Sequence, residues 1–542
     1  LLPAVIDETA RASPEKVFAI TPRTGSLRDG YTQTTYAQVA RAVNKLAWWL
    51  DEKLGQWPDG VEPEMLAYIG PRDLRYAIIV VAAMKTNRQV LVPLSQNSPE
   101  ATINLINLTK PSTLIGTTDM PSVWDGVCAA KPKMRVTMLP QLDELYHDVP
   151  VEEYPYTKTW AEGKNDPIHV NHTSGTTGLP KPVPWTNAVG ATFDRDRELA
   201  AVAPEGKKLA WTLLAQKKII VTMPPEWIAG LLLTLHFPVY LDTIPILLPT
   251  DAPTPLTAEY MDTVHRMLPD ADGGVYVPDL LKQLAKHPAY VNNMRHLKMA
   301  AYAGAALDKA VGDLLHSFLK VQPLMGTTEV GGFPLLESDP VHWDHLRFDV
   351  EHPSGARVVP HEEDGMFELV IQRLRGQDDF QPIFRLEHGK DSDVYHTRDL
   401  FEEHPDEKGV WLFVGRTDDF VKLSNLTKFN AGHVEDIINR HPLIREAVMG
   451  GDGRKRPFVL VQLVGDVDAG GFRDEREREK MVEAIWPAFE EVNKLVAEDI
   501  SLRKELVLFT RPERPVVKVG NKGTINRRAT LEAYKAEVER IY

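Results

Sequence analysis

The chain has 542 residues, of which 43% are hydrophobic and 25% are charged, as expected for a globular protein with two or more domains. Lysine and arginine total 62 against 76 aspartate and glutamate residues, and the net charge of −14 argues against binding to nucleic acid. Cys128 is the single cysteine, which excludes an internal disulfide and a cysteine-based zinc cluster and favours a reducing, cytoplasmic environment.

The N-terminal end and the most apolar segment give no sign of a membrane or secreted protein. LLPAVIDETA has no basic stretch before its apolar residues, so we do not expect a secretory signal. WIAGLLLTLHFPVYLDTIPILLPT is interrupted by His236, Pro238 and Asp242 before it reaches a spanning length, and is expected to be buried core. Residue 1 is not methionine, which suggests a fragment of a longer polypeptide.

Helix and strand patterns alternate through the first part of the chain. Residues 35–53 place Val39, Val43, Leu46 and Leu50 at helical intervals and predict an amphipathic helix. The apolar runs RYAIIVVAAMKT and RQVLVPL, with turn residues between them, predict short buried strands. GGVYVPDLLKQLAK repeats the order of strand and then helix. The alternation predicts an α/β architecture with buried sheets.

After about residue 350, the sequence contains more charged residues and more turn signals. EHPSGARVVPHEEDGMFELVIQ is rich in turn signals and predicts hairpins. GRTDDFVKL ends a strand, and the remainder contains the apolar PFVLVQLVG and the charged helix FRDEREREKMVEAIWPAFEEVNKLV. We therefore predict an α/β fold in two domains: residues 1–417, a large domain of buried mixed sheets flanked by helices, and residues 418–542, a small α+β domain.

The segment HTSGTTGLPK, residues 172–181, has the composition of an anion-binding loop. Its spacing fits neither the Walker pattern nor the GxGxxG fingerprint. Glycines allow backbone N–H groups to converge, hydroxyls add donors, and Lys181 adds a positive charge. On composition alone, a polar surface loop is the alternative.

Further segments follow this loop in a fixed order: MGTTE at 325–329, YHTRDL at 395–400, GRTDDFVK at 415–422 and KVGNKGTINRR at 518–528. With HTSGTTGLPK, they resemble the ordered motifs of the adenylate-forming superfamily of acyl-CoA synthetases, luciferases and peptide-synthetase adenylation domains. The segments VPLSQNSPEA, YHTRDLFEEHPDEKGVWLFVGRTDDFVKLSN and KGTINRRATLEAYKAEVERIY most resemble the fungal adenylate-forming carboxylic acid reductases. In that family, a carrier domain and an NADPH-dependent reductase domain follow the adenylation domain.

The resemblance implies a nucleotide site with ATP and Mg²⁺ as cofactors. Thr328 is expected to bond the α-phosphate and Glu329 to hold Mg²⁺, a cation that prefers carboxylate oxygen. Asp399 is expected to accept from the ribose hydroxyls, with help from Arg416. The remaining nucleotide-binding candidates are Thr173, Ser174, Gly175, Thr176, Thr177, Gly178 and Lys181 in the phosphate loop, Ala303, Gly304 and Ala305 beside adenine, and Met325, Gly326 and Thr327, where Met325 stands in place of the aromatic residue common in the family.

The resemblance also assigns roles in the C-terminal part. Lys522, in KGT, is the candidate catalytic lysine that bridges the substrate carboxylate and the α-phosphate. The superfamily commonly reads GKxxR, whereas Arg527 here lies five residues after Lys522, so Lys518 is the alternative. Asp418 matches the hinge about which the small, mobile domain turns between the two half-reactions.

The acid pocket is predicted from MPPEWIAGLLLTLHF. Aligned on the superfamily's PxxHxxG, Trp227 stands where histidine is common, and Ile228 stands where relatives that activate α-amino acids carry an aspartate. Ile228 offers no partner for an ammonium, so a non-α-amino acid, aryl or compact aliphatic, is expected. A cation–π site on Trp227 with Glu226 nearby, for a betaine, is a second hypothesis. The expected pocket residues are Trp227, Ile228, His236, Tyr302, Gly331 and Phe333.

The resemblance therefore predicts ATP-dependent activation of a carboxylic acid and transfer of the acyl group to the phosphopantetheine thiol of a carrier domain. The expected partners are the acid, the carrier domain and the NADPH-dependent reductase domain of the parent polypeptide, with no nucleic acid and no membrane. A stand-alone acyl-CoA ligase would use the same residues. A catalytically inactive nucleotide-binding module is the third interpretation, and the intact loop with Glu329, Asp399 and Arg416 argues against it.

Overall fold

The computed structural model describes residues 1–173, 179–199, 206–361, 365–387, 389–417, 420–425, 427–465, 472, 475–519 and 524–542. The chain divides into two compact units. Unit 1 consists of residues 1–357, 370–395 and 404–411, and unit 2 consists of residues 358–369, 396–403 and 412–542. The predicted cut after residue 417 stays a prediction, and unit 2 includes residues 358–369, 396–403 and 412–417 from before that position.

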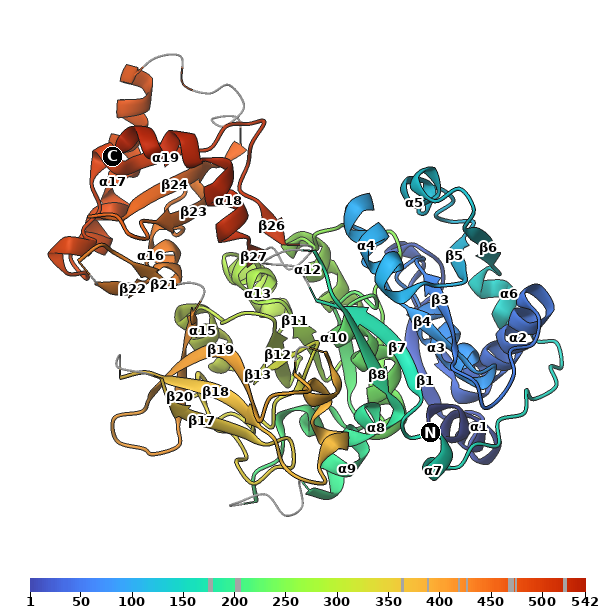
Figure 1. Ribbon diagram of the computed structural model, residues 1–542. Helices are drawn as coiled ribbons and strands as arrows, with labels where there is room; N and C mark the ends of the chain where they lie inside the picture. The colour runs from blue at the N-terminus through green and yellow to red at the C-terminus, as the bar shows by residue number, and fades with distance from the viewer. Residues whose placement is uncertain are drawn as a thin grey trace. The chain divides into compact units, whose positions relative to one another are not determined.

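Unit 1 contains a seven-stranded sheet in which five adjacent pairs are parallel and the β1–β2 pair at the edge is antiparallel. Leucine, methionine and valine side chains of the helices pack against isoleucine and tyrosine side chains of the strands in one buried cluster. In sheet order, the strands are β13 Lys320–Leu324, β12 Met299–Ala303, β11 Gly273–Tyr276, β9 Lys218–Val221, β10 Ile244–Ile246, β1 Val17–Pro22 and β2 Tyr31–Thr35. The helices that contribute to the cluster include α12 Ala258–Met267, α13 Pro278–Ala285 and α15 Lys309–His316. Figure 1 shows α12, α13 and α15 beside this sheet.

A second, six-stranded sheet of unit 1 has the same character, with parallel pairs and an antiparallel edge strand, β8. Its strand order is β6 Arg135–Leu139, β5 Thr113–Thr117, β3 Glu64–Tyr68, β4 Arg88–Leu91, β7 Pro167–His172 and β8 Pro182–Thr186. Strands β3, β4, β5 and β7 are mostly buried, as expected for parallel strands covered on both faces, whereas the edge strand β6 is largely exposed.

The helix predicted at residues 35–53 is α2, Tyr36–Leu54. The Thr35 side chain accepts from the Gln38 backbone N–H, and the Gln38 side chain accepts from the Thr35 backbone N–H, which forms a capping box. Gly55 follows the last turn with a φ of 85°, a backbone conformation that favours glycine. Local sequence signals therefore set both ends of this helix.

The run RYAIIVVAAMKT is not a strand: Arg75–Lys85 forms helix α3, and this prediction was wrong. Every residue of α3 is buried, so the helix has no polar face to reveal a helical period. Its two charged ends are paired, Arg75 with Asp73 and Asp119 and Lys85 with Asp7, which compensates their burial. RQVLVPL does contain the predicted strand, β4.

A five-stranded sheet contains the strands predicted after residue 350. Its order is β16 His345–Leu346, β20 Trp411–Arg416, β19 Val394–Glu403, β18 Phe367–Gln372 and β17 Ala356–Pro360.

The C-terminal part of unit 2 has its own core around a three-stranded sheet. Strand β23, Ile444–Gly450, pairs antiparallel with β24, Phe458–Leu463, which pairs parallel with β25, Val507–Phe509. Helices α16, Ala431–Ile438, and α17, Glu475–Asn493, contribute to the same buried cluster. Short strands β26, Lys518–Val519, and β27, Thr524–Ile525, pair with each other before helices α18, Arg527–Ala533, and α19, Lys535–Ile541. The predicted class, α/β with a large N-terminal and a smaller C-terminal domain, is confirmed.

Candidate active site

The predicted nucleotide residues of unit 1 follow the carboxyl ends of parallel strands. β7 leads to Thr173, β12 ends at Ala303, and β13 leads to Met325. β12 and β13 are neighbours, and Ala303 pairs with Leu324 in their parallel register. Ligands of open α/β sheets bind beyond the carboxyl ends of the strands, so the topology supports a site here.

The ends of the predicted phosphate loop are held together by two hydrogen bonds. The Thr173 N–H donates to the Lys181 carbonyl over 3.0 Å, and the Lys181 N–H donates to Thr173 Oγ1 over 3.1 Å. Lys181 is exposed and Thr173 is half-buried. The predicted residues Ser174, Gly175, Thr176, Thr177 and Gly178 lie outside the described residues.

MGTTE forms a tight hairpin with the glycines that follow it. β14, Gly326–Thr327, pairs antiparallel with β15, Gly331–Gly332, and the Phe333 N–H donates to the Met325 carbonyl over 2.9 Å. Thr328 and Glu329, both half-buried, lie at the turn of this hairpin. A threonine hydroxyl and a carboxylate presented together suit a phosphate with its Mg²⁺, since Mg²⁺ is usually held by one or two carboxylates and substrate phosphates.

The segment after β12 has the open backbone expected beside a planar ring. Gly304 has a φ of 97°, which L side chains rarely adopt, and a Cβ there would meet no atom within 4 Å. Backbone conformation, rather than lack of space, therefore requires glycine at this position. Gly304 and Ala305 are exposed.

In unit 2, Asp399 is 5% exposed, and Arg416 Nη1 donates to its Oδ1 over 3.1 Å. Burial raises the pKa of Asp399 to about 6, while the Arg416 guanidinium opposes that rise. The structure thus brings together the two residues that were predicted to bind ribose. A buried carboxylate of this kind gains from donors such as ribose hydroxyls, because they stabilise its ionised form.

Glu368, on β18, is a residue that sequence reasoning missed. Its carboxylate accepts from the Arg398 N–H over 2.9 Å and lies 2.8 Å from His396 Nδ1. Arg398 has a φ of 68°, in the left-handed region, so Glu368 stabilises a strained backbone next to Asp399. No local pattern identifies this role, because Glu368 lies 30 residues before Arg398.

Most of the residues predicted for the acid pocket are buried. Ile228 is half-buried, and Trp227, which precedes helix α10, Ile228–Leu231, is 9% exposed. His236 lies in η4, Leu232–His236, and its Nε2 is 3.1 Å from Nε2 of His169. Tyr302 belongs to the buried cluster of the seven-stranded sheet, and Phe333 is fully buried.

Glu226 is already paired. Arg72 Nε donates to Glu226 Oε1 over 3.0 Å, and the Glu226 side chain is 1% exposed. The Asn171 side-chain amide donates to the Glu226 carbonyl over 3.3 Å. Arg72 therefore neutralises the carboxylate that the betaine hypothesis placed near Trp227.

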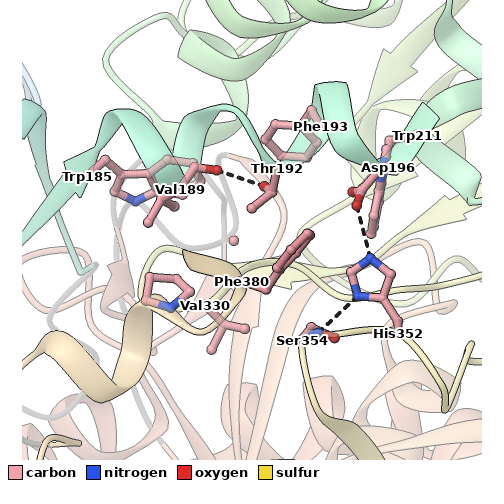
Figure 2. Close-up of a pocket in the computed structure, with 13 residues that line it drawn as sticks. Trp185, Val189, Thr192, Phe193, Asp196, Trp211, Val330, His352, Ser354 and Phe380 are labelled. Carbon is pink, nitrogen blue, oxygen red and sulfur yellow. Dashed lines mark hydrogen bonds and ion pairs between the residues drawn. The ribbon is translucent and has the colours of Figure 1, made fainter. Parts of the chain in front are cut away.

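A partly open cavity with an empty volume of about 340 Å³, solvent space included, is lined in part by Val330, Gly331 and Gly332 of the MGTTE hairpin. Figure 2 shows the side chains that surround it. The Ser354 N–H donates to His352 Nδ1 over 3.1 Å, so His352 Nε2 carries the proton toward Asp196 Oδ1, 3.0 Å away. Of the predicted pocket residues, Gly331 lines this cavity. Its lining residues are Trp185, Val189, Thr192, Phe193, Asp196, Trp211, Val330, Gly331, Gly332, His352, Ser354, Phe380 and Pro382.

Of the two candidate lysines, Lys518 lies in the C-terminal hairpin of β26 and β27. Lys518, at the start of β26, pairs with Glu446, whereas Lys522 lies outside the described residues. Asp418, the predicted hinge, also lies outside them. Arg527 pairs with Glu435, a residue to which sequence reasoning assigned no role, and joins helix α18 to α16.

Within the part of the chain that the structure describes, no group of three or more histidine, cysteine, aspartate or glutamate side chains could hold a metal ion. None of the helices described there is long and apolar enough to cross a membrane.

Two family models match the chain. The model described as AMP-binding enzyme matches residues 6–360, and the model described as AMP-binding enzyme C-terminal domain matches residues 418–542.

The curated relatives include fungal reductases. A carboxylic acid reductase of Neurospora crassa is 28% identical over 545 residues, which cover 99% of this chain and 50% of the relative. The adenylate-forming reductase Nps10 of Heterobasidion annosum is 27% identical over 568 residues, which cover 100% of this chain and 49% of the relative. The chain thus spans about half the length of these relatives.

Solved structures of similar fold include an anthranilate CoA ligase, AuaEII, in complex with anthranoyl-AMP. Its TM-score is 0.70 at 15% identity, with 99% of this chain and 98% of that chain covered. ATP-bound MatB from Rhodopseudomonas palustris has a TM-score of 0.68 at 15% identity, with 99% and 100% covered. These likenesses establish the fold.

Proposed function

This chain belongs to the AMP-binding enzyme family, and from that premise we propose that it is the adenylation domain of a carboxylic acid reductase. It activates a carboxylic acid with ATP as an acyl-adenylate and releases pyrophosphate. It then transfers the acyl group to the phosphopantetheine thiol of a carrier domain, where an NADPH-dependent reductase domain reduces it. The observation that carries the proposal is the match of family models to both parts of the chain, together with reductase relatives aligned over nearly all of it.

The reaction requires neutralisation of the negative charges on the phosphates and on the carboxylate, which is a weak electrophile. A carboxylate reacts poorly with nucleophiles because its charge is delocalised and its leaving group would be oxide, and coupling to AMP supplies a stable leaving group. Thr173 and Lys181, which are hydrogen-bonded to each other, close the base of the loop that holds the β- and γ-phosphates in this proposal. Thr328 and Glu329 orient the α-phosphate and its Mg²⁺, which stabilises the charge of the phosphoryl oxygens when bound.

Asp399 and Arg416 hold the ribose in this proposal. The buried Asp399 carboxylate accepts hydrogen bonds from the ribose hydroxyls, and the Arg416 guanidinium favours its ionised form. Lys522 bridges the acid carboxylate and the α-phosphate, and Asp418 is the hinge that lets the small domain serve both half-reactions.

The acid carries no α-amino group and is aryl or compact aliphatic. Ile228 supports this part of the proposal, because an ammonium beside it would have no carboxylate partner. The Arg72–Glu226 ion pair weighs against the betaine version, since the carboxylate nearest in sequence to Trp227 is already neutralised.

The test is an acid-dependent ATP–pyrophosphate exchange panel of benzoates, short aliphatic acids, betaines and the common amino acids. We expect exchange with an acid of the first two groups. Strong turnover of an ordinary α-amino acid would refute the substrate class, and betaine turnover lost in Trp227→Leu would restore the second hypothesis. No exchange with any acid would favour an inactive nucleotide-binding module.

The thiol acceptor is tested separately. With the best acid, acyl transfer to a phosphopantetheinylated carrier domain is compared with transfer to free CoA at equal concentration. The proposal expects the carrier to be preferred, and efficient turnover of CoA alone would identify a stand-alone acyl-CoA ligase instead.

A further inference from the structure

Trp185 connects the strand that leaves the phosphate loop with the MGTTE hairpin. It lies on β8, four residues after Lys181, and is 1% exposed. Its indole Nε1–H donates to the carbonyl oxygen of Thr328 over 3.1 Å. Thr328 and Glu329 lie at the turn of that hairpin, so one side chain fixes the backbone of the residue expected to bond the α-phosphate.

The Trp185 ring is itself held by two buried histidines. His169 pairs with Trp185 in the antiparallel register of β7 and β8, and its ring stacks on the indole with centroids 5.7 Å apart and planes at 24°. The His236 ring meets the indole edge-on at 6.0 Å, and its Nε2 is 3.1 Å from Nε2 of His169. Burial lowers the pKa of both histidines, that of His236 to about 3, so both rings are neutral at physiological pH. One of the two Nε2 atoms therefore donates its N–H to the other.

These contacts join three parts of the predicted site. His169 lies on the strand that enters the phosphate loop, Trp185 on the strand that leaves it, and His236 on the segment assigned to acid recognition. Gly190, in helix α8, Asn187–Gly190, closes the packing: a Cβ there would lie 2.7 Å from His236 Cε1. The rings lie in the interior of unit 1, at fixed angles, and have little room to move.

The hairpin also touches a second tryptophan, which offers a matched comparison. A Cβ on Gly331 would lie 3.4 Å from Trp185, and a Cβ on Gly332 would lie 2.9 Å from Trp211. Trp211 is 4% exposed, and its Nε1–H donates to Asp196 Oδ2 over 3.1 Å. Both tryptophans line the cavity of Figure 2, with Trp211 next to Asp196. Their indole hydrogen bonds have equal length, but Trp185 donates to the Thr328 carbonyl and Trp211 donates to the Asp196 carboxylate.

We propose that Trp185 is a positioning residue for adenylate formation, which sets Thr328 and Glu329 relative to the strands that bound the phosphate loop. This inference rests on the proposed function of those residues. Without the indole N–H, the Thr328 carbonyl loses its buried donor and the hairpin turn can shift relative to the bound phosphates. A shift of about 1 Å at a reacting group lowers rates by roughly a hundredfold, so a small backbone displacement is sufficient.

The experiment compares Trp185→Phe with Trp211→Phe in the same chain. Each removes one indole N–H and leaves one buried acceptor, and because the acceptor of Trp211 is the Asp196 carboxylate, Trp211→Phe should lower the melting temperature at least as much as Trp185→Phe. Acid-dependent ATP–pyrophosphate exchange is measured as a function of Mg²⁺ and ATP concentration. We expect Trp185→Phe to lower kcat by roughly ten- to a hundredfold and to require more Mg²⁺, and Trp211→Phe to change kcat by less than about threefold.

Each outcome decides between distinct ideas. Wild-type protein without exchange for any acid would overturn the proposed function and this inference with it. Active wild-type protein with equal losses in the two variants, or with an unchanged Mg²⁺ requirement in Trp185→Phe, would overturn the inference alone. If Trp185→Phe does not fold, Trp185→Met, which also lacks the N–H donor, replaces it, and a Mg²⁺ dependence equal to that of Trp211→Phe would then refute the positioning role.

Discussion

Replacing Asp399 with asparagine should stabilise the protein and weaken nucleotide binding at the same time. Asp399 is 5% exposed, and burial raises its pKa from 3.8 to about 6 in spite of the Arg416 guanidinium. Asparagine has nearly the shape of the protonated acid and carries no charge to desolvate. The variant therefore removes the desolvation free energy that the buried carboxylate costs the folded protein, and it also removes the expected ribose contact.

The magnitude follows from the pKa. Between pH 3.8 and about 6, the folded protein binds more protons at Asp399 than the unfolded chain does, so the free energy of unfolding falls as pH rises through this range. Above about pH 6 the loss is complete and constant. A pKa difference of this size corresponds to roughly 3 kcal/mol, and we expect Asp399→Asn to recover about 1 to 3 kcal/mol at pH 7.5.

The assay is thermal unfolding of wild-type and Asp399→Asn protein at pH 5.0 and pH 7.5, with AMP binding measured at the same two values. The variant should melt higher by several degrees at pH 7.5 and by roughly half that amount at pH 5.0, which lies about midway between the unfolded and folded pKa values of Asp399. Its AMP affinity at pH 7.5 should fall by roughly ten- to a hundredfold, as expected for the loss of hydrogen bonds to a charged group.

A lower melting temperature of Asp399→Asn at pH 7.5 would refute this reasoning, because it would mean that the Arg416 contact outweighs the cost of burial. A gain that is equal at both pH values would also refute it, since the cause would then not be ionisation. Unchanged AMP affinity with the expected stability gain would leave the burial argument intact and remove Asp399 from the ribose site.

Three further predictions concern the candidate lysine, the hinge and the backbone beside Asp399. Lys522→Ala should lower acid-dependent exchange by roughly a hundredfold or more, as for the loss of one preorganised charge at the reacting phosphate; a severe loss in Lys518→Ala with a mild one in Lys522→Ala would reverse the assignment. Asp418→Pro should preserve exchange and slow acyl transfer to the carrier thiol, because the two steps need different placements of the small domain; equal losses in both assays would contradict a hinge. Glu368→Gln should raise the KM for ATP by roughly tenfold with little change in kcat, through the Arg398 backbone that it holds; an unchanged KM in the folded variant would exclude this positioning role.

The sequence by itself determined the features whose physics is local. The Thr35 capping box and the glycine after Leu54 set the ends of helix α2, and each depends on residues within one turn. The glycines, hydroxyls and lysine of residues 172–181 predict an anion-binding loop from composition alone. The order of the motifs along the chain was sufficient to identify the family.

The tertiary structure decided what depends on burial and on contacts between distant segments. Arg75–Lys85 became a helix although its apolar run suited a strand, because a segment buried on every side shows no period. Trp185 contacts the backbone of a residue 143 positions later, and Glu368 holds the backbone of a residue 30 positions later. Sheet register and chain topology bring these partners together, and neither can be read from the residues near them. The local sequence therefore predicted the groups that are expected to bind, whereas only the fold shows which groups contact them from distant parts of the chain.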